Sequence, residues 1–223
     1  MTKLTARLVG LTQPTIDLRV PSAEGLVAFC ARVSNPQHQD KELGSLLDYC
    51  IRNKHWSVFE MSNAVVEVEA PRDISRQLLR HRSFSFQEFS QRYFDEIEFT
   101  DREFRSQDTK NRQNSIDDLD DDLTSSLKKA VGEFVGVVKN AYADMRSHKV
   151  AKECARVILP EGLTMSRLYV NGTLRSWLHY LDVRDDPGVT QWEHVLLARE
   201  IRKVLEPAFP NIFRSFSNEK DAV

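Results

Sequence analysis

The alternation of hydrophobic and polar positions predicts three strands in this chain. Leu4 to Leu11 has the pattern of a first strand, and Ala64 to Ala70 alternates as a half-buried strand that Pro71 ends. Leu163 to Val170 is a third candidate, and Asn171-Gly172 after it is a turn signal. The strands occur singly or as hairpins, without the regular alternation of strand and helix that a parallel sheet requires.

Apolar residues at helical spacing predict helices between and after these strands. Ser22, Asp73 and Thr173 are expected to begin three of them, and Thr190 to Glu193 forms a capping box for the last. In the longest helix, the apolar side is expected to pack in the core or against another subunit. The expected ranges are 22–33, 41–53, 74–81, 123–145, 150–159, 173–181 and 191–205.

These elements predict an α+β fold, with helices packed against an antiparallel sheet. No repeat and no Gly/Ser-rich linker divides the sequence, so one domain over residues 1–223 is expected. Residues 100–122 are polar and end in an acidic run. They are interpreted as a variable, solvated, mobile loop rather than a metal site.

Composition adds few constraints. Hydrophobic residues make up 41% and charged residues 29% of the chain, which is ordinary for a soluble globular protein. The formal net charge of −2 gives no reason to expect a nucleic-acid or membrane partner, so any anion site must be a local concentration of basic residues. No secretion signal and no bilayer-spanning run is recognised, and a cytoplasmic location is expected, in the host if the source is viral.

The cysteines do not predict a metal site. Cys30, Cys50 and Cys154 are widely spaced and form neither a CxxC pair nor a zinc pattern. Cys30 and Cys154 lie in helical patterns, so buried reduced thiols are expected, in agreement with a cytoplasmic location.

Arginines concentrate between residues 72 and 92, against the near-neutral background of the chain. Arg76 and Arg80 are four residues apart and would share a helical face, where like charges repel unless an anion is bound. The alternative is a basic solvated surface, but Phe84, Phe86 and Phe89 are interleaved and are costly to expose. The five arginines are Arg72, Arg76, Arg80, Arg82 and Arg92.

The order of these residues resembles the signature of flavin-dependent thymidylate synthases. Arg80-His81-Arg82 is followed, after seven residues, by Ser90. His55 to Glu60 is similar to the family's His-x-Ser/Thr-x-x-Glu segment, and Ala155 to Pro160 is similar to its Ala-Arg-x-x-Leu-Pro segment. The resemblance covers about residues 26–205. Further matches in family order are Asn171, Arg175, His179 and Arg184.

Two positions depart from the family pattern. Gln87 stands where many relatives have Asn, a longer amide that still donates and accepts hydrogen bonds. After Arg184, the chain reads Val189-Thr190-Gln191 where many relatives have His-Ala-Gln. One histidine contact to the flavin therefore lacks its counterpart, and His194 lies too late to be taken as a replacement.

The resemblance implies reductive methylation of dUMP to dTMP. The carbon donor would be 5,10-methylenetetrahydrofolate, and the hydride would come from FAD that NADPH reduces. The sequence has no GxGxxG nucleotide-binding motif, so FAD would have to be held in a family-specific way. The resemblance implies FAD sites at the subunit interfaces of a homotetramer. No cysteine has the Pro-Cys-His context of classical thymidylate synthase, which implies catalysis without a cysteine nucleophile.

The resemblance also implies ligand sets. Those for FAD are Ser57, Arg80, His81, Arg82, Glu88, Asn171, Arg175 and His179. Those for dUMP are Gln77, Arg80, Glu88, Ser90, Gln91, Arg92, Arg156 and Arg184.

Three of these residues have more specific expectations. Arg184 would act catalytically by favouring ionisation at uracil N3, because a fixed charge ~4 Å away is worth roughly 4 kcal/mol before desolvation losses. Ser90 is expected to position the substrate, since an unassisted serine is a weak nucleophile. His179 would line one wall of the FAD site with Arg175, four residues earlier, although it has an alternative as a plain surface residue.

Three other interpretations remain open on the sequence. A nucleic-acid binding module could use the arginines and phenylalanines of residues 72–92, with strongly salt-dependent binding. A flavoprotein of a different reaction, such as a reductase, would not need the pair Arg156 and Arg184. A structural oligomer without catalysis would not explain so many convergent polar residues.

Overall fold

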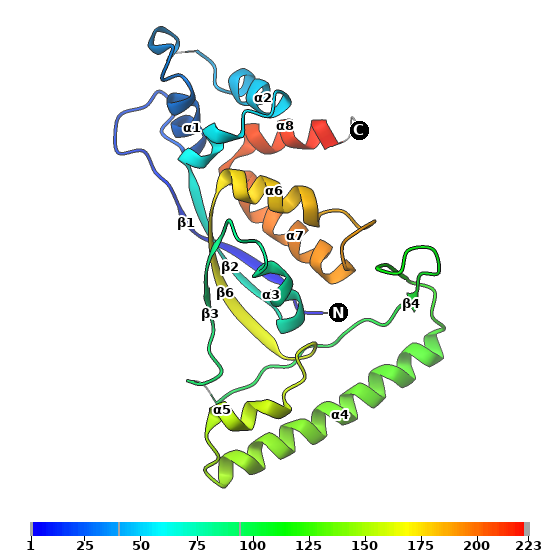
Figure 1. The fold of residues 1–223 in the computed structure, drawn as a ribbon. Coiled ribbons are helices and arrows are strands. Elements are labelled where there is room, and N and C mark those ends of the chain that lie inside the picture. Colours follow the sequence, from blue (N-terminus) through cyan, green and yellow to red (C-terminus); the bar gives the residue numbers. More distant parts are fainter. Residues whose placement is uncertain (1, 40, 94, 221–223) are drawn as a thin grey trace.

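A computed structural model describes residues 2–39, 41–93 and 95–220 of the chain. Its centre is a four-stranded antiparallel sheet in the order β1-β2-β6-β3, packed with helices (Figure 1). The predicted α+β class is therefore confirmed. The expected domain limits include residues 1, 40, 94 and 221–223, which lie outside the described residues. The strands are β1 Thr5–Leu11, β2 Asn63–Pro71, β3 Ser85–Glu88, β4 Ser106–Gln107, β5 Ser115–Ile116 and β6 Met165–Thr173.

Helices pack against the sheet, and in the described residues short 3-10 helices connect several of these elements along the chain. The α-helices are α1 Ala23–Ala31, α2 Gly44–Arg52, α3 Arg72–Leu78, α4 Asp121–Ser147, α5 Lys152–Ala155, α6 Leu174–Arg184, α7 Trp192–Leu205 and α8 Pro210–Lys220. The 3-10 helices are Pro36–His38, Trp56–Met61, Arg156–Ile158 and Glu206–Ala208. The sequence patterns did not predict β3 or α8, and the helix expected over 150–159 is divided between α5 and a 3-10 helix.

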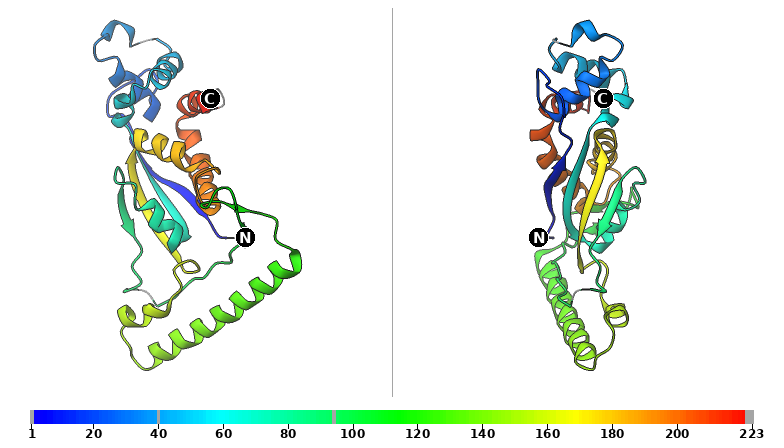
Figure 2. Two further views of the ribbon diagram at one scale, coloured as in Figure 1. Left: turned by 45° about the vertical axis from the view of Figure 1, so that its right-hand side comes forward. Right: turned by 90° about the vertical axis from the view of Figure 1, so that its left-hand side faces the viewer.

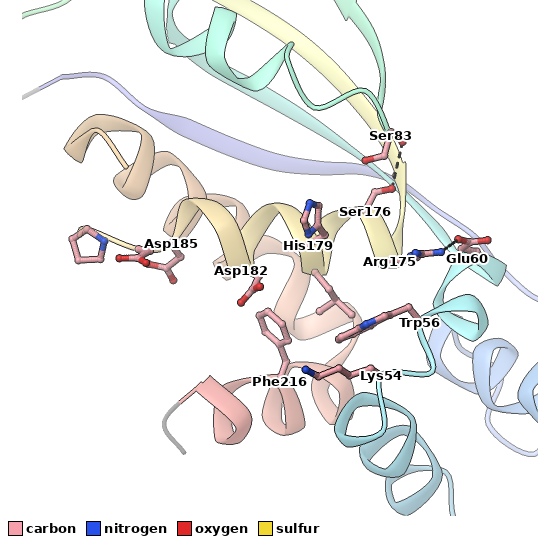
Figure 3. Close-up of a pocket in the computed structure, with 13 residues that line it drawn as sticks. Lys54, Trp56, Glu60, Ser83, Arg175, Ser176, His179, Asp182, Asp185 and Phe216 are labelled. Atoms are coloured by element: carbon pink, nitrogen blue, oxygen red, sulfur yellow. Dashed lines mark hydrogen bonds and ion pairs between the residues drawn. The ribbon is translucent and has the colours of Figure 1, made fainter. Parts of the chain in front are cut away.

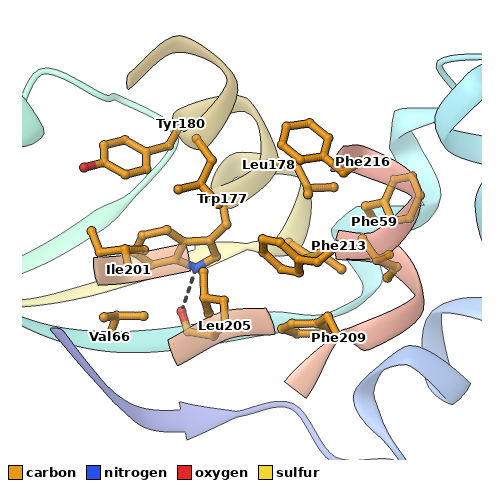
Figure 4. Close-up of a cluster of buried hydrophobic side chains, with 14 of the residues drawn as sticks. Phe59, Val66, Trp177, Leu178, Tyr180, Ile201, Leu205, Phe209, Phe213 and Phe216 are labelled. Atoms are coloured by element: carbon orange, nitrogen blue, oxygen red, sulfur yellow. Dashed lines mark hydrogen bonds between the residues drawn. The ribbon is translucent and has the colours of Figure 1, made fainter. Parts of the chain in front are cut away.

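The core lies where α6 and α7 pack on the sheet and continues to α8, which packs beside α2 (Figure 4). Alternation in β2 buries Val66 and Val68, which face Val170 and Leu168 of β6 in the antiparallel register. Trp177 of α6 is fully buried, and its ring N–H donates to the carbonyl of Ala64 at 3.2 Å, so this large side chain leaves no polar atom unpaired.

Asn171-Gly172 is not a turn, contrary to the sequence prediction. Both residues belong to β6, which continues to Thr173. The glycine is required for a packing reason, because a Cβ at Gly172 would lie 2.2 Å from Cδ1 of Phe84. The dipeptide therefore marks a close approach of an aromatic ring to a strand.

Two of the predicted helix caps form and one does not. Ser22 accepts a hydrogen bond from the Gly25 amide, and Thr173 accepts one from the Ser176 amide, as expected. Asp73 does not cap α3, which begins at Arg72 directly after Pro71. Its carboxylate instead binds the guanidinium of Arg102 in two hydrogen bonds of 3.1 Å.

The predicted capping box at the start of α7 is also absent. The helix begins at Trp192, and the Thr190 hydroxyl donates to the carbonyl of Val183 at 3.1 Å. Glu193 turns to Arg105 at 2.6 Å. The two side chains that matched the motif are therefore used for tertiary contacts.

Residues 100–122 have more structure than the predicted solvated loop. Strands β4 and β5 pair within this segment, and the Asn111 amide donates to the carbonyl of Gly188 at 2.8 Å. The acidic run begins α4, since Asp120 accepts from the amides of Asp122 and Leu123.

Helix α4 extends away from the sheet in every view (Figures 1 and 2). Among its described residues only Val138 and Tyr142 are buried, whereas Phe134 and Val137 are 50% and 67% exposed. The apolar side of α4 was predicted to pack either in the core of the same chain or against another subunit. Packing in the core is wrong for most of the length of the helix. Packing against another subunit stays a prediction.

The cysteines differ in exposure. Cys50 is buried, and burial raises the pKa of its thiol. Cys30 is half-buried, but Cys154 is exposed, so the prediction of a buried thiol at that position is wrong. The described residues contain no group of acidic, histidine and cysteine side chains arranged to hold a metal ion. Within the same part of the chain, no helix is long and apolar enough to cross a membrane.

Candidate functional site

A pocket of about 1070 Å³ opens along α6 (Figure 3). This volume is at the upper end of the range of roughly 300–1,000 Å³ for small-molecule and cofactor sites. Arg175 and Glu60 lie at one end and Asp185 at the other. The lining residues are Lys54, Trp56, Glu60, Ser83, Arg175, Ser176, Leu178, His179, Asp182, Asp185, Asp186, Pro187 and Phe216.

One wall of this pocket matches a sequence prediction. Arg175 and His179 are one helical turn apart on α6 and both line the cavity. Glu60 holds Arg175 in place through an ion pair from the 3-10 helix Trp56–Met61. The hydroxyl of Ser176 donates to the carbonyl of Ser83 at 3.4 Å, which ties the Arg-His-Arg loop to this wall.

The two segments with the most specific motifs meet at the other end of α6. The Nε of Arg184 donates to Nε2 of His81 at 2.9 Å, across 103 positions of sequence. Burial, and then the charge of Arg184, lowers the pKa of His81 to about 4. The imidazole is therefore neutral near pH 7, with Nε2 as the acceptor and the proton on Nδ1. Burial also lowers the pKa of Arg184, which stays protonated because guanidinium is so weak an acid.

Sequence analysis missed two residues beside this contact. Tyr180 is fully buried, with its ring centroid 5.1 Å from that of His81, and burial raises the pKa of its phenol. His194 of α7 is also fully buried; its Nε2 lies 3.1 Å from the Tyr180 hydroxyl and its Nδ1 lies 3.2 Å from Oε1 of Gln77. Burial, followed by the charge of Arg184, lowers the pKa of His194 to about 3. The sequence feature that could have pointed to His194 is a histidine among apolar residues on the inward side of a predicted helix.

Gln77 connects this cluster to the polar segment before α4. Its Nε2 donates to Oε1 of Gln191 at 2.7 Å, and Nε2 of Gln191 donates to Glu193 at 3.0 Å. Burial alone would raise the pKa of Glu193, but the hydrogen bond from Arg105 and the charge of Arg102 bring it below its usual value. Glu193 is therefore an ionised carboxylate with only 2% of its surface exposed.

The remaining predicted dUMP ligands lie toward the other end of β3, near α5 (Figure 1). Glu88 pairs with Arg72 at 3.3 Å and accepts a hydrogen bond from Ser166 at 3.0 Å. Ser90 accepts from the amide of Arg92 at 3.3 Å, and the Arg92 guanidinium reaches Glu153 of α5 at 3.4 Å.

Two more predicted ligands lie near this end. Gln91 is buried, and its Nε2 has no hydrogen-bond partner among the described residues. Arg156 is exposed on the 3-10 helix directly after α5. A buried amide N–H without a partner is unusual in a native structure.

The arginines of residues 72–92 do not share one helical face. Helix α3 ends at Leu78, so Arg80 lies in the turn beyond it, and Arg76 pairs separately with Glu161 at 2.9 Å. The expectation of a shared face for Arg76 and Arg80 is wrong. Arg80 is exposed, and its charge contributes to the lowered pKa of His81.

Three other predicted FAD ligands, Ser57, Arg82 and Asn171, are exposed. Asn171 lies opposite Ser85 in the register of β6 and β3, so it is close to the loop that carries Arg82. The structure thus gathers the predicted residues in two places. The Arg80–Arg82 loop and α6 form the first, and the far end of β3 with α5 forms the second.

Comparison with known proteins gives consistent results. The family described as "Thymidylate synthase complementing protein" matches residues 16–211. A flavin-dependent thymidylate synthase of Synechocystis sp. is 44% identical over 94% of this chain and 97% of its own length. A probable flavin-dependent thymidylate synthase of Paramecium bursaria Chlorella virus 1 is 41% identical over 95% and 98%. A crystal structure of the UMP/dUMP methylase PolB from Streptomyces cacaoi, bound with 5-Br UMP, is similar with a TM-score of 0.81, 25% identity and coverage of 98% and 96%.

Proposed function

Because this chain belongs to the family of flavin-dependent thymidylate synthases, we propose that it methylates dUMP to dTMP. The carbon donor is 5,10-methylenetetrahydrofolate, and the reductant that regenerates reduced FAD is NADPH. The observation that carries the proposal is the 2.9 Å contact between Arg184 and His81, because it joins two motif segments that are 103 positions apart. Catalysis without a cysteine nucleophile remains part of the proposal, because neither Cys30, Cys50 nor Cys154 stands in the Pro-Cys-His context of classical thymidylate synthase.

The pocket along α6 supports an FAD site. Its volume of about 1070 Å³ admits a large part of a dinucleotide, and Trp56 offers a ring for stacking. Lys54 and Arg175 can bind phosphate groups, whereas Asp185 and Asp186 disfavour them at the other end. Bound FAD supplies the hydride. The proposed ligands remain Ser57, Arg80, His81, Arg82, Glu88, Asn171, Arg175 and His179.

The proposed dUMP ligands divide between the two ends of β3. Gln77 and Arg184 would hold the uracil, and Ser90 and Arg92 would hold the phosphate. Arg184 contacts a neutral His81. No recorded contact of the described residues places a carboxylate beside Arg184, and therefore its positive charge is not cancelled. A guanidinium ~4 Å from N3 contributes roughly 4 kcal/mol gross, enough to lower the N3 pKa by one or two units after desolvation. The full proposed set is Gln77, Arg80, Glu88, Ser90, Gln91, Arg92, Arg156 and Arg184.

A homotetramer with active sites between subunits is the proposed assembly, and residues 1–223 are proposed to form one domain. Two features support the assembly. Phe134 and Val137 leave an apolar side of α4 exposed, and the buried amide of Gln91 lacks a partner among the described residues. Large apolar side chains exposed in a contiguous row are typical of subunit contacts.

The first experiment is an absorbance spectrum of the purified protein. Bound flavin gives a yellow protein, and addition of dUMP should perturb the flavin bands. Formation of dTMP is then measured with methylenetetrahydrofolate and NADPH. A colourless protein that neither takes up FAD nor binds dUMP contradicts the proposal. Flavin without any dUMP response points to a different flavoprotein reaction.

A further inference from the structure

A chain of hydrogen bonds runs beneath the proposed uracil site, through side chains from α3, α6 and α7. Glu193 accepts from Gln191 at 3.0 Å, and Gln191 accepts from Gln77 at 2.7 Å. Oε1 of Gln77 lies 3.2 Å from Nδ1 of His194, and Nε2 of His194 lies 3.1 Å from the Tyr180 hydroxyl. We call these five residues the Gln77 chain. His194 does not occur in the motifs that identify the family, so none of the proposed ligand sets includes it.

The chemistry of Glu193 fixes the direction of every bond in the Gln77 chain. An ionised carboxylate can only accept, so the group that Gln191 turns toward it must be the NH₂ end. The oxygen of Gln191 then faces Gln77 and must receive its NH₂ end. The oxygen of Gln77 therefore faces His194, whose Nδ1 must carry the proton. This order follows from donor and acceptor capacity, and it does not depend on how each amide is assigned.

The position of the proton on His194 also fixes the last bond. A neutral imidazole with its proton on Nδ1 accepts at Nε2, so the Tyr180 hydroxyl donates to it. His194 is fully buried, and the lowering of its pKa to about 3 keeps it neutral over the working range. Each polar atom of the chain thus has a partner of the required type, as buried networks need.

Residues 100–122 anchor this chain at its charged end. Arg105 donates to Glu193 at 2.6 Å, and Arg102 lies 3.8 Å from the same carboxylate while it also binds Asp73. A carboxylate that is 2% exposed needs such partners to stay ionised. The segment expected to be a solvated loop therefore holds the group that sets the direction of the whole chain.

We propose that the Gln77 chain locks the side-chain amide of Gln77 in one orientation for binding the uracil of dUMP, and that His194 is a positioning residue in it. This rests on the proposed function, since Gln77 is a ligand only if dUMP is the substrate. Gln77 keeps one N–H and one oxygen lone pair free for the base, and the chain fixes which end of the amide donates and which accepts. Without His194 only the bond to Gln191 restrains the amide, so its plane and the oxygen turned toward the base are no longer held in place.

Two substitutions at His194 separate positioning from packing. In His194→Asn the amide nitrogen is bonded through Cγ, like Nδ1, so it can still donate to Gln77. In His194→Gln the amide lies one carbon further, near the place of Nε2, so it can satisfy Tyr180 but not Gln77. Both introduce a neutral amide at a buried site, and therefore they share the general cost of the change.

The measurements are dUMP affinity by titration calorimetry, KM for dUMP and for NADPH, and flavin content, all on the full-length protein. We expect His194→Gln to weaken dUMP binding and raise its KM about tenfold, the usual effect of one misplaced hydrogen bond. We expect His194→Asn to stay within about twofold of the parent, with NADPH KM and flavin content unchanged in both. The matched control is the same pair of changes at His148, which is exposed at the end of α4.

Equal loss of dUMP affinity in both His194 variants would overturn the positioning role, because only packing would then have been tested. No loss in either variant would overturn it as well. A parent protein that does not bind dUMP would contradict the proposed function instead. The direction of the chain is testable in that case too. Histidine-selective nitrogen-15 labelling gives signals from 6 residues, and His194→Asn identifies one by its disappearance. A proton on Nε2 of His194 would disprove the chain.

Discussion

His81 and Ser90 belong to the same motif, but they differ in what surrounds them. The surroundings of His81 are closed, since Arg184, Tyr180 and Phe84 contact it from the same chain. The surroundings of Ser90 are open. Its hydroxyl accepts only a local amide hydrogen bond in the recorded contacts of the described residues, and the neighbouring Arg92 has one ion pair between half-exposed groups.

The difference shows how the proposed site is divided between folding and binding. Groups at the closed end are desolvated and fixed before any ligand arrives, so their electrostatic effect on a substrate costs no reorganisation. Apart from buried Gln91, the groups at the open end are at least partly solvated and can be ordered by a phosphate or by a second subunit. We therefore expect substitutions at the closed end to change the chemical step and the stability, and substitutions at the open end to change binding.

The largest expected effect is that of Arg184→Ala on the formation of dTMP. Removal of a guanidinium that lowers the N3 pKa by one or two units after desolvation should reduce kcat by about two orders of magnitude. Steady-state kinetics and dUMP binding measure the two consequences separately. Arg167→Ala, which removes an exposed arginine paired with Glu69, should have almost no effect. A variant of Arg184 with more than a tenth of the parent kcat would show that the closed end is not the centre of activation.

The second prediction concerns stability below neutral pH. His81 and His194 have folded pKa values of about 4 and about 3, against an ordinary value of 6.5. Their contribution to the free energy of unfolding is fully present well above pH 6.5. It is lost as the pH falls toward the folded values, because the unfolded chain binds protons that the folded chain does not.

From pH 6.5 to pH 5 we expect a loss of about 2.5 kcal/mol, after a discount for the partial exposure of His81. Urea unfolding at a series of pH values measures it. Since His194→Asn lacks one of the two groups, it should lose about half of this pH dependence. An unchanged slope in that variant would mean that His194 is protonated in the folded protein.

Much of the closed end could be predicted from the sequence, because its residues lie in motifs of fixed order. Arg175 and His179 are predicted by the resemblance, and helical spacing predicts that they line one wall together. The contact between Arg184 and His81 was not predictable, since residues 103 positions apart meet only through the packing of α6 on the sheet. His194 lies too late in the sequence to be taken as the family histidine, and nothing in the sequence shows that it is buried beside Gln77 and Tyr180.

Predictions failed where side chains had a tertiary partner that local rules do not contain. Asp73 and Glu193 matched capping patterns, but Arg102 and Arg105 bind them instead. These arginines come from residues 100–122, which have no periodic pattern and were interpreted as solvent-exposed. Gly172 was read as a turn because its sequence context did not show the ring of Phe84 above it.

The third prediction tests how tightly the closed end is packed. Gly172→Ala would place a Cβ 2.2 Å from Cδ1 of Phe84, whose ring centroid lies 4.4 Å from that of buried Trp177. The ring cannot move without disturbing the core, so we expect a loss of about 2 kcal/mol in the free energy of unfolding. Gly132→Ala is the control, because its Cβ meets nothing within 4 Å on α4, and it should stabilise by up to about 1 kcal/mol. Equal stability of the two variants would mean that the closed end can relax.

The smallest expected effect belongs to the open end, at Ser90. Ser90→Ala removes a hydroxyl that accepts a local amide bond and would contact the phosphate, so KM for dUMP should rise about tenfold while turnover persists. Ser85→Ala, at an exposed serine where β3 begins, is the control and should behave as the parent. Steady-state kinetics with a direct dUMP binding measurement separates the two roles of Ser90. Complete loss of dTMP formation with dUMP still bound would place a chemical step at the open end, and the division between a closed end for chemistry and an open end for binding would then be wrong.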